Sequence, residues 1–178
     1  AEYFSFHTTD AEYQLLEKIR HIPKTKFLAG NADFALGIVT GNNKKYISSV
    51  KNKDNEVILK GSDICKYHTN PNSNYIVFNP QNFQQVAPVE LYRAPEKLLY
   101  RFISSQLVFA YDDKQTLSLN SCNVVIPKLE GLHIKYILAI LNSRIAQFIY
   151  KMEFHSVKVL RSHIENIPIP DVNADMQN

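Results

Sequence analysis

The residues best suited to bind a polyanion lie in one short segment, residues 37–47, which reads GIVTGNNKKYI. Glycines let backbone N–H groups approach phosphate oxygens closely, asparagine amides can hydrogen-bond to base edges, and lysines neutralise phosphates. The segment therefore predicts a loop that faces nucleic acid, whereas an ordinary solvated hairpin with a Gly-Asn-Asn turn is the alternative. The candidate contact residues of this loop are Thr40, Gly41, Asn42, Asn43, Lys44 and Lys45.

Further basic residues are unevenly distributed along the chain. Residues 42–60 contain five lysines and two acidic residues, although the net charge of the whole chain is only +3. Arg101 lies in an apolar segment whose neighbours would face the other side of a strand, so that Arg101 projects onto either a nucleic acid or solvent. A last basic group, which either contacts nucleic acid or forms a solvated surface, consists of His155, Lys158 and Arg161.

The sequence contains no motif for catalysis or cofactor binding. None of its five glycines forms a G-x-G-x-x-G or G-x-x-x-x-G-K loop, which would cradle the phosphates of a nucleotide. Asn79-Pro80 resembles the start of the Asn-Pro-Pro-aromatic motif with which amino-methyltransferases hold an adenine, but the second proline and the aromatic residue are missing. We therefore expect a turn at this position, and neither a catalytic residue nor a cofactor in this chain.

Two short motifs contain metal-binding residue types, and for each a simpler interpretation is stronger. Cys65-x-x-His68 has the spacing of half a zinc site, but structural zinc needs four ligands and no second close pair follows. Asp112-Asp113-Lys114 resembles part of a Mg²⁺-dependent nuclease site, in which acidic residues bind the metal and a lysine orients water. A tight acidic turn between two strands explains the same residues. We expect no metal site and keep a nuclease as the least favoured alternative.

Length and composition indicate a soluble, cytoplasmic protein. The 178 residues, 45% of them hydrophobic and 21% charged, suffice for one domain or at most two small lobes. Two cysteines are too few for a disulfide framework and suit a reducing compartment. No apolar run approaches the ~20 residues that span a membrane. Because the sequence starts at Ala1 without a methionine, we expect a fragment of a longer chain.

Turn signals and hydrophobic periodicity predict the elements that position these residues. A capping-box spacing at Thr9 predicts a short amphipathic helix that ends before Pro23. Residues 81–96, with glutamine, asparagine and prolines, predict an irregular loop that could separate two lobes. Four short strands are predicted in the first half of the chain, over residues 34–39, 46–50, 57–59 and 75–78.

The second half of the chain has the strongest strand and helix signals. Aromatic and branched residues over 98–103, 107–111 and 116–126 predict an antiparallel meander. Apolar residues then recur with helical spacing and predict one long helix over residues 134–152. The prolines of residues 167–170 favour an extended exit. The fold class is therefore α+β: a mixed or antiparallel β-sheet with a long helix in the C-terminal half and short flanking helices.

Several blocks, in their order along the chain, resemble the signatures of one protein family. They are GIVTGNNKKYI (37–47), LKGSDICKY (59–67), KLLYR (97–101), AYDD (110–113), YILAILNSR (136–144) and IPIP (167–170). The chain is similar to the TaqI-like C-terminal specificity domains, which are the target-recognition domains of type II and IIG restriction–modification enzymes that methylate adenine N6. Each block is loose by itself, whereas the ordered set is specific and covers nearly the whole chain.

The resemblance implies a non-catalytic domain that recognises a sequence in double-stranded DNA. It would position that DNA for an adenine-N6 methyltransferase domain of the same parent chain. The parent, rather than this chain, would be the enzyme; it would bind S-adenosylmethionine, and Mg²⁺ if it also carries a nuclease. The implied organisation is a lead-in with a helix over residues 1–26, the recognition domain over 27–170 and a tail over 171–178.

A second interpretation is an interaction module of the specificity-subunit type, which recruits separate methyltransferase chains in a multi-subunit restriction system. Such a module would have a second, similar domain, and only one copy is visible in this sequence. In both interpretations we expect structural roles for three polar residues of the family-like blocks, namely Asp63, Asn142 and Ser143.

Overall fold

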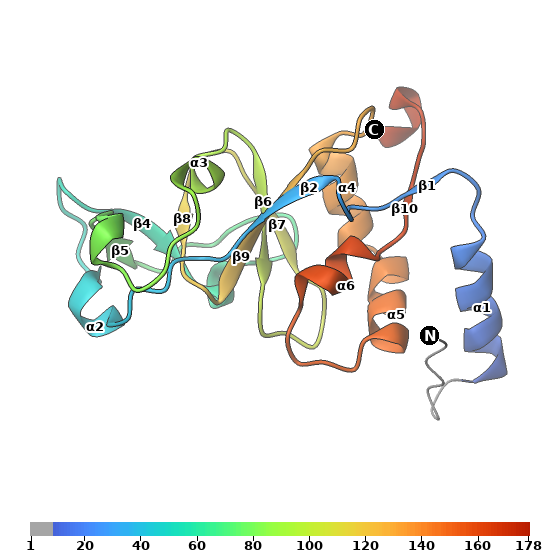
Figure 1. Cartoon of the computed structure of the whole chain (residues 1–178), viewed down its shortest axis with the longest axis horizontal. Helices are drawn as coiled ribbons and strands as arrows, with labels where there is room; N and C mark the ends of the chain where they lie inside the picture. Colours follow the sequence, from blue (N-terminus) through green and yellow to red (C-terminus); the bar gives the residue numbers. More distant parts are fainter. Residues whose placement is uncertain (1–8) are drawn as a thin grey trace.

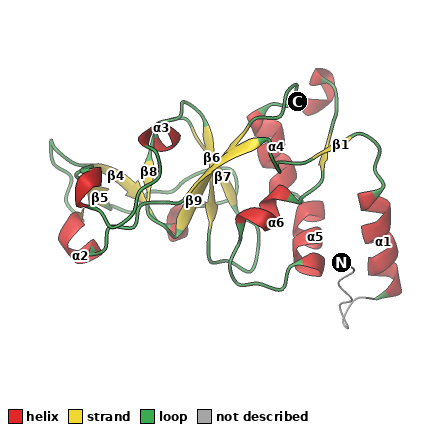
Figure 2. Ribbon diagram, in the orientation of Figure 1, coloured by secondary structure: helices red, strands yellow, loops and turns green. Residues whose placement is uncertain are grey.

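The computed structural model describes residues 9–178 and has a four-stranded sheet at its centre (Figure 1). This central sheet consists, in spatial order, of β2 (Ala32–Ala35), β9 (Cys122–Pro127), β6 (Lys97–Arg101) and β7 (Phe109–Asp112). Every neighbouring pair of strands is antiparallel. The α+β class predicted from the sequence is confirmed, because helices and antiparallel strands together build the domain (Figure 2).

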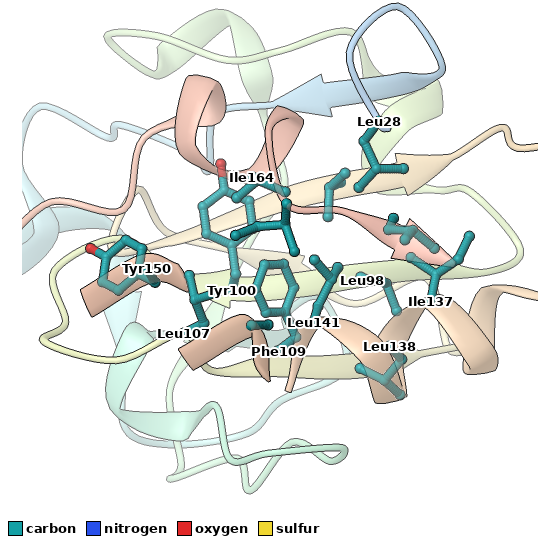
Figure 3. Close-up of a cluster of buried hydrophobic side chains, with 14 of the residues drawn as sticks. Leu28, Leu98, Tyr100, Leu107, Phe109, Ile137, Leu138, Leu141, Tyr150 and Ile164 are labelled. Atoms are coloured by element: carbon teal, nitrogen blue, oxygen red, sulfur yellow. The ribbon is translucent and has the colours of Figure 1, made fainter. Parts of the chain in front are cut away.

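The middle strands of the central sheet direct alternate side chains into two separate cores. Leu98 and Tyr100 of β6 lie in a core shared with the helices, here called the helical core, and Figure 3 shows this cluster. Leu99 of the same strand lies in a second core, shared with the smaller strands. On β9, Val125 and Val124 divide between the two cores in the same way. Both faces of the sheet are thus buried, which explains why these strands are apolar throughout.

The helical core is closed mainly by α4 (Ile134–Leu141), α5 (Arg144–Glu153) and α6 (Arg161–Glu165). The single long helix predicted over residues 134–152 is wrong, because the chain breaks between α4 and α5. Ser143 begins α5, since its hydroxyl accepts a hydrogen bond from the backbone N–H of Ala146 at 3.2 Å. The break also shifts the buried face of α5. Ile145, which the continuous helical period placed in the core, is 54% exposed.

The N-terminal helix α1 (Asp10–Arg20) begins at the predicted capping box, in which Thr9 and Glu12 bond each other reciprocally. It ends before Pro23, as predicted, and its Leu16 and Ile19 join the helical core. Among residues 9–178 no helix is both long and apolar enough to cross a membrane.

The two ends of the predicted recognition domain meet in a short antiparallel pair. β1 (Thr25–Lys26) pairs with β10 (Ile169–Pro170), so that the extended exit predicted for residues 167–170 is confirmed for its second half. The chain then closes with the 3₁₀ helix η3 (Ala174–Gln177).

A second sheet lies at the end of the molecule opposite to α1 (Figure 1). In spatial order its strands are β3 (Ile47–Ser48), β5 (Tyr75–Ile76), β4 (Glu56–Leu59) and β8 (Leu117–Ser118). β3, β5 and β8 are shorter than predicted because the chain turns after two residues, whereas β4 begins one residue earlier than predicted. Single helical turns connect these strands to the central sheet; they are α2 (Asn43–Tyr46), η1 (Gly61–Asp63), η2 (Pro80–Asn82) and α3 (Val89–Tyr92).

Two predictions about the arrangement of these strands are wrong. Residues 98–126 do not form a simple meander, because β8 leaves the central sheet to pair in parallel with β4, and β9 returns to the far side of β6. Residues 81–96 do not separate two lobes, because β8, later in the chain, belongs to the second sheet. They contain α3, whose Tyr92 is fully buried and donates a hydrogen bond from its hydroxyl to the Leu36 carbonyl at 2.6 Å.

Candidate nucleic-acid interface

The loop that was predicted to face nucleic acid folds into a capped helical turn. Gly41 has a positive φ of 80°, and the chain then enters α2 through Asn42. The Asn42 side-chain oxygen accepts a hydrogen bond from the Lys45 N–H at 3.2 Å, and so acts as the N-cap. Thr40 is only 3% exposed, and its hydroxyl donates to the Asn43 side-chain oxygen. The threonine therefore supports the turn from inside.

The atoms that α2 presents to solvent are mainly hydrogen-bond donors. Because the oxygens of Asn42 and Asn43 already accept intramolecular bonds, the amide NH₂ groups are the freer ends of these exposed side chains. Lys44 and Lys45 are exposed, and among residues 9–178 neither has an acidic group within ion-pair distance. Donors and ammonium groups suit phosphate oxygens and the acceptor edge of purines.

Arg101 ends β6 and is held in place by the backbone of a neighbouring segment. Its Nε donates a hydrogen bond to the Ile64 carbonyl at 2.9 Å, and the side chain is half-buried. The preceding residue, Tyr100, faces the helical core, which confirms that Arg101 points to the other face of its strand. There it lines an open pocket of about 490 Å³, together with Lys60, Gly61, Ser62, Ile103 and Ser121.

The basic group after α5 is joined to the same region by backbone pairing. The Ser104 N–H donates to the Val157 carbonyl at 3.0 Å, and the Val159 N–H donates to the Phe102 carbonyl at 2.7 Å. Lys158 is therefore paired with Ile103, which lines the pocket of Arg101. Lys60 and Arg101 thus line one pocket, while the backbone of Lys158 pairs beside it and its ammonium group lies 5.9 Å from the centroid of the Phe102 ring.

The other two residues of this basic group are less directly placed. Arg161 is exposed, but its guanidinium bonds Glu165 at 3.1 Å and stacks over Phe34, so that part of its charge is neutralised within the domain. His155 is exposed on the chain between α5 and α6. In Figure 1, α2, the turn after β6 and the chain before α6 all lie along the lower edge of the molecule. These backbone segments thus follow the same edge in this view, with α2 at its far end.

Sequence reasoning counted Lys60 only as one of five nearby lysines and did not consider Ser62 or Ser121 as site residues. One sequence feature could have identified Lys60 as a site residue: it lies directly after an apolar strand and before Gly61, where the chain turns. Ser121 carried no signal, because its place beside Gly61 depends on two segments that are distant in the sequence.

The acidic residues of the nuclease hypothesis are not arranged to bind a metal ion. Asp112 is 4% exposed and forms an ion pair at 2.5 Å with Lys97, which is fully buried. The other Asp112 contacts are the backbone N–H and hydroxyl of Thr116, at 3.0 and 2.7 Å. Within residues 9–178 no group of three or more His, Cys, Asp or Glu side chains is suitably placed for a metal. Asp112 therefore has a structural role.

The pKa values of this buried pair reflect both burial and mutual attraction. Burial alone would raise the pKa of Asp112, but the hydrogen bond and charge of Lys97, with the two Thr116 donors, hold it below its ordinary value. Burial lowers the pKa of Lys97, and Asp112 opposes that shift. Each group of this ion pair therefore depends on the other as its counter-charge.

The remaining polar residues of the family-like blocks have structural partners, as predicted. The Asp63 carboxylate accepts a hydrogen bond from the Lys60 N–H at 2.8 Å and is buried. Asn142 bonds the backbone of β7 through its side chain.

Cys65 and His68 bond each other only through their backbones, at 3.0 Å, within an ordinary turn. Both cysteines are free thiols, and burial raises the pKa of Cys122 well above its usual range.

Comparison with known proteins gives one matching family model, described as the TaqI-like C-terminal specificity domain, which covers residues 56–169. The matched range includes Lys60, Arg101 and Lys158 and begins after α2. The chain is also similar to the type II methyltransferase M.VspI of Vibrio sp. (strain 343), with 40% identity over 63 residues. That alignment covers 35% of this chain and 15% of the methyltransferase.

Two solved structures have a similar fold. The first is a chain from a type I R-M system studied for its assembly and conformational transition, with a TM-score of 0.54 and 14% identity over 93% of this chain and 40% of that chain. The second is the HsdS subunit from Thermoanaerobacter tengcongensis, with a TM-score of 0.50 and 13% identity over 94% of this chain and 41% of the subunit. The chain thus spans less than half the length of each of these proteins.

Proposed function

The chain belongs to the family of TaqI-like C-terminal specificity domains, which makes it a DNA-recognition domain of restriction–modification systems, and we propose that it selects the target sequence for an adenine-N6 methyltransferase. In this proposal the methyltransferase domain belongs to the same parent chain and works in the cytoplasm. The similarity to M.VspI supports a type II methyltransferase as the parent. The similarity to HsdS is one of fold, and no feature of residues 9–178 favours a multi-subunit arrangement.

The observation that carries this proposal is that Lys60 and Arg101 line one pocket and that the segment of Lys158 pairs directly beside it. Lys60, Arg101 and Lys158 come from three distant segments, and within residues 9–178 none of them has an acidic group within ion-pair distance. Unpaired cations that share a surface favour a polyanion, because their charge is not already neutralised within the protein. Lys44 and Lys45 of α2 extend the same charge along this edge.

We assign different tasks to the two parts of this interface. The exposed amides of Asn42 and Asn43 donate to base edges, while Lys44 and Lys45 bind phosphates beside them. Arg101 and Lys158, with Arg161 and His155 next to them, hold the duplex in register. Thr40 and Gly41 fix the shape of the α2 turn, so their contribution to DNA binding is indirect. The DNA-binding unit then corresponds to residues 27–170, and β1, directly before it, pairs with β10 at its end.

The chemistry of methyl transfer takes place outside this chain in our proposal. The residues present do not suit S-adenosylmethionine, because there is no glycine-rich loop and Asn79-Pro80 begins the short helix η2 instead of an adenine-binding strand end. The cofactor belongs to the methyltransferase domain, and Mg²⁺ would be required only by a separate nuclease domain. A nuclease within this chain is not favoured, because Lys97 neutralises Asp112 in the interior.

Duplex binding by the chain itself tests the proposed function. Fluorescence anisotropy with labelled duplexes of several unrelated sequences, measured over a range of salt concentrations, gives both affinity and the salt slope. We expect binding at low salt that weakens steeply as salt rises, and a preference for some sequences over others. Absence of binding to every duplex at low salt would contradict the proposal.

A further inference from the structure

The pocket beside Arg101 has the composition of an anion site. It has a volume of about 490 Å³ and is lined by Lys60, Gly61, Ser62, Arg101, Ile103 and Ser121. Two of these side chains are cationic and two are hydroxyls, and no carboxylate is among them. A pocket in which cations and hydroxyls face one another without an acid favours a negatively charged ligand.

The orientation of Arg101 leaves the two terminal amino groups of its guanidinium available for a ligand. Its Nε is used in the hydrogen bond to the Ile64 carbonyl at 2.9 Å, and this bond fixes the direction of the side chain. Neither of the two terminal amino groups forms a hydrogen bond to another described residue. Both can therefore donate to a ligand in the pocket. Paired N–H donors match the oxygens of a phosphate. Arg101 is therefore oriented before any ligand arrives.

Lys60 is positioned by its backbone in a similar way. Its N–H donates to the Asp63 carboxylate at 2.8 Å, which holds the start of η1, while its ammonium group has no acidic partner among the described residues. Lys60 adds a second positive charge to the pocket at a fixed point of the chain.

Hydrogen bonds connect the segments that form the walls of the pocket. The Gly61 N–H donates to the Ser121 hydroxyl at 3.0 Å, and the Phe102 N–H donates to the Ser121 carbonyl at 3.1 Å. A Cβ on Gly61 would lie 2.5 Å from the Ser121 carbonyl oxygen, so only glycine permits this approach. Three segments that are distant in the sequence are thus locked around the pocket. Such preorganisation lowers the cost of ordering side chains on binding.

We propose that this pocket binds one backbone phosphate of the DNA, with Lys60 and Arg101 as its charged ligands and Ser62 as a hydroxyl donor. The inference rests on the proposed function, since it names a contact within the DNA interface. The pocket is wider than a phosphate group, so the adjoining deoxyribose lies against the exposed side chain of Ile103. The charged groups of this pocket are donors only, which suits the acceptor oxygens of a phosphate.

The test compares the wild-type chain with a Lys60→Ala/Arg101→Ala variant in duplex binding over a range of salt concentrations. We expect roughly tenfold weaker binding at a given salt, as for loss of a charged hydrogen bond. The plot of log affinity against log salt should lose about 1 unit of slope. Because a phosphate carries no sequence information, all duplexes should weaken by the same factor. The matched control, Lys114→Ala/Lys135→Ala, removes the same charge from exposed lysines near the opposite end of β7 and should bind like wild type.

A second variant distinguishes weaker DNA binding from loss of folding, because Arg101→Ala also removes the hydrogen bond to Ile64. Ser62→Asp leaves that bond intact and places a negative charge in the pocket, so it should weaken binding by a similar factor. Asn173→Asp makes the same change of charge at an exposed helix cap far from the pocket and should have no effect.

The outcomes separate this inference from the proposed function. If wild type binds DNA and both pocket variants bind equally well with the same salt slope, the phosphate site is wrong while the DNA-binding function stands. If the variants change the relative affinities of different duplexes, Arg101 reads a base and the phosphate assignment is overturned. If wild type binds no duplex, the proposed function fails, and the inference fails with it.

Discussion

The side-chain amide of Asn142 forms two hydrogen bonds with the backbone of Phe109, one to its N–H and one to its carbonyl, both at 2.9 Å. Gln147 bonds the N–H and carbonyl of Leu107 in the same manner, both at 2.8 Å. Phe109 begins β7, the last strand of the central sheet, and Leu107 lies just before it. The amides of Asn142, between α4 and α5, and of Gln147, in α5, thus cover this end of the edge strand, next to the bridge between Tyr67 and Ala110.

Replacing Asn142 with alanine should strongly destabilise the domain. The Phe109 N–H would be left buried without its partner, and such a loss costs about 1–3 kcal/mol for each unsatisfied group. We expect the free energy of unfolding in urea to fall by at least this amount. Asn72→Ala, at an exposed loop position, should change it by no more than about 0.5 kcal/mol. Equal stability of the Asn142 variant and wild type would show that water satisfies the strand edge instead.

Removing one partner of the buried Lys97–Asp112 pair should cost more than removing both. Asp112→Asn leaves the ammonium of Lys97 buried without a counter-charge, which typically costs about 3–5 kcal/mol. A Lys97→Met/Asp112→Leu double variant buries no charge, and we expect it to be more stable than either single variant. Urea unfolding of wild type, Lys97→Met, Asp112→Leu and the double variant gives the coupling free energy directly. Additive effects of the two substitutions would contradict mutual dependence.

The stability of the domain should fall when the medium becomes acidic enough to protonate His163. Burial lowers the pKa of His163 below its ordinary value of 6.5. The ring Nδ1 lies 3.2 Å from the Leu160 N–H, from which it accepts, and the ring stacks on Phe154 with centroids 4.3 Å apart. Because the folded pKa is depressed, this contribution is complete above pH 6.5 and is lost as the pH falls through the folded value.

The comparison protein for this pH effect is His163→Asn, whose side-chain oxygen can accept the same hydrogen bond without titrating. Urea unfolding at several pH values on both sides of 6.5 should give a steeper loss of stability for wild type than for the variant. Identical pH profiles would show that His163 is not responsible.

Gly37 should not tolerate any side chain. A Cβ at this position would lie 2.1 Å from the Leu119 carbonyl oxygen and 2.6 Å from that of Cys122. Both are backbone atoms of the central region and cannot rotate away, so Gly37→Ala should cost more than ~3 kcal/mol, the upper range for overpacking. Gly131→Ala, in open space but at a positive φ of 79°, should cost only about 1–2 kcal/mol. A mild effect of Gly37→Ala on the thermal midpoint would contradict the close approach.

Neutralising the lysines of α2 should flatten the salt dependence of DNA binding. If Lys44 and Lys45 each bind a phosphate, the Lys44→Ala/Lys45→Ala variant should lose about 2 units of slope in log affinity against log salt. Asn42 caps the helical turn independently of both lysine side chains, so the fold should be unaffected. The Lys114→Ala/Lys135→Ala control should keep the wild-type slope. An unchanged slope in the α2 variant would place the DNA away from α2.

The sequence by itself determined those helices and strands whose formation depends on interactions between residues close together in the chain. The capping box at Thr9 and Glu12 forms α1, and the apolar strand patterns locate β4, β6 and β7 to within two or three residues. Helical periodicity located the region of α4 and α5, because each buries one apolar stripe, but it predicted neither the break between them nor α6. The ordered blocks were sufficient for the family, since the matched residues 56–169 include all of them except the first block and the final residue of the last.

The tertiary structure alone decided features that depend on contacts between distant residues. The break at Asn142 and Ser143 interrupts an unbroken apolar period, because Asn142 bonds Phe109, which lies 33 positions earlier. The parallel pairing of β8 with β4 has the same kind of cause. The predicted α2 loop became a helical turn with a buried Thr40. The proposed phosphate pocket exists only because folding brings Lys60, Arg101 and Ser121 together, and no local pattern encodes that proximity.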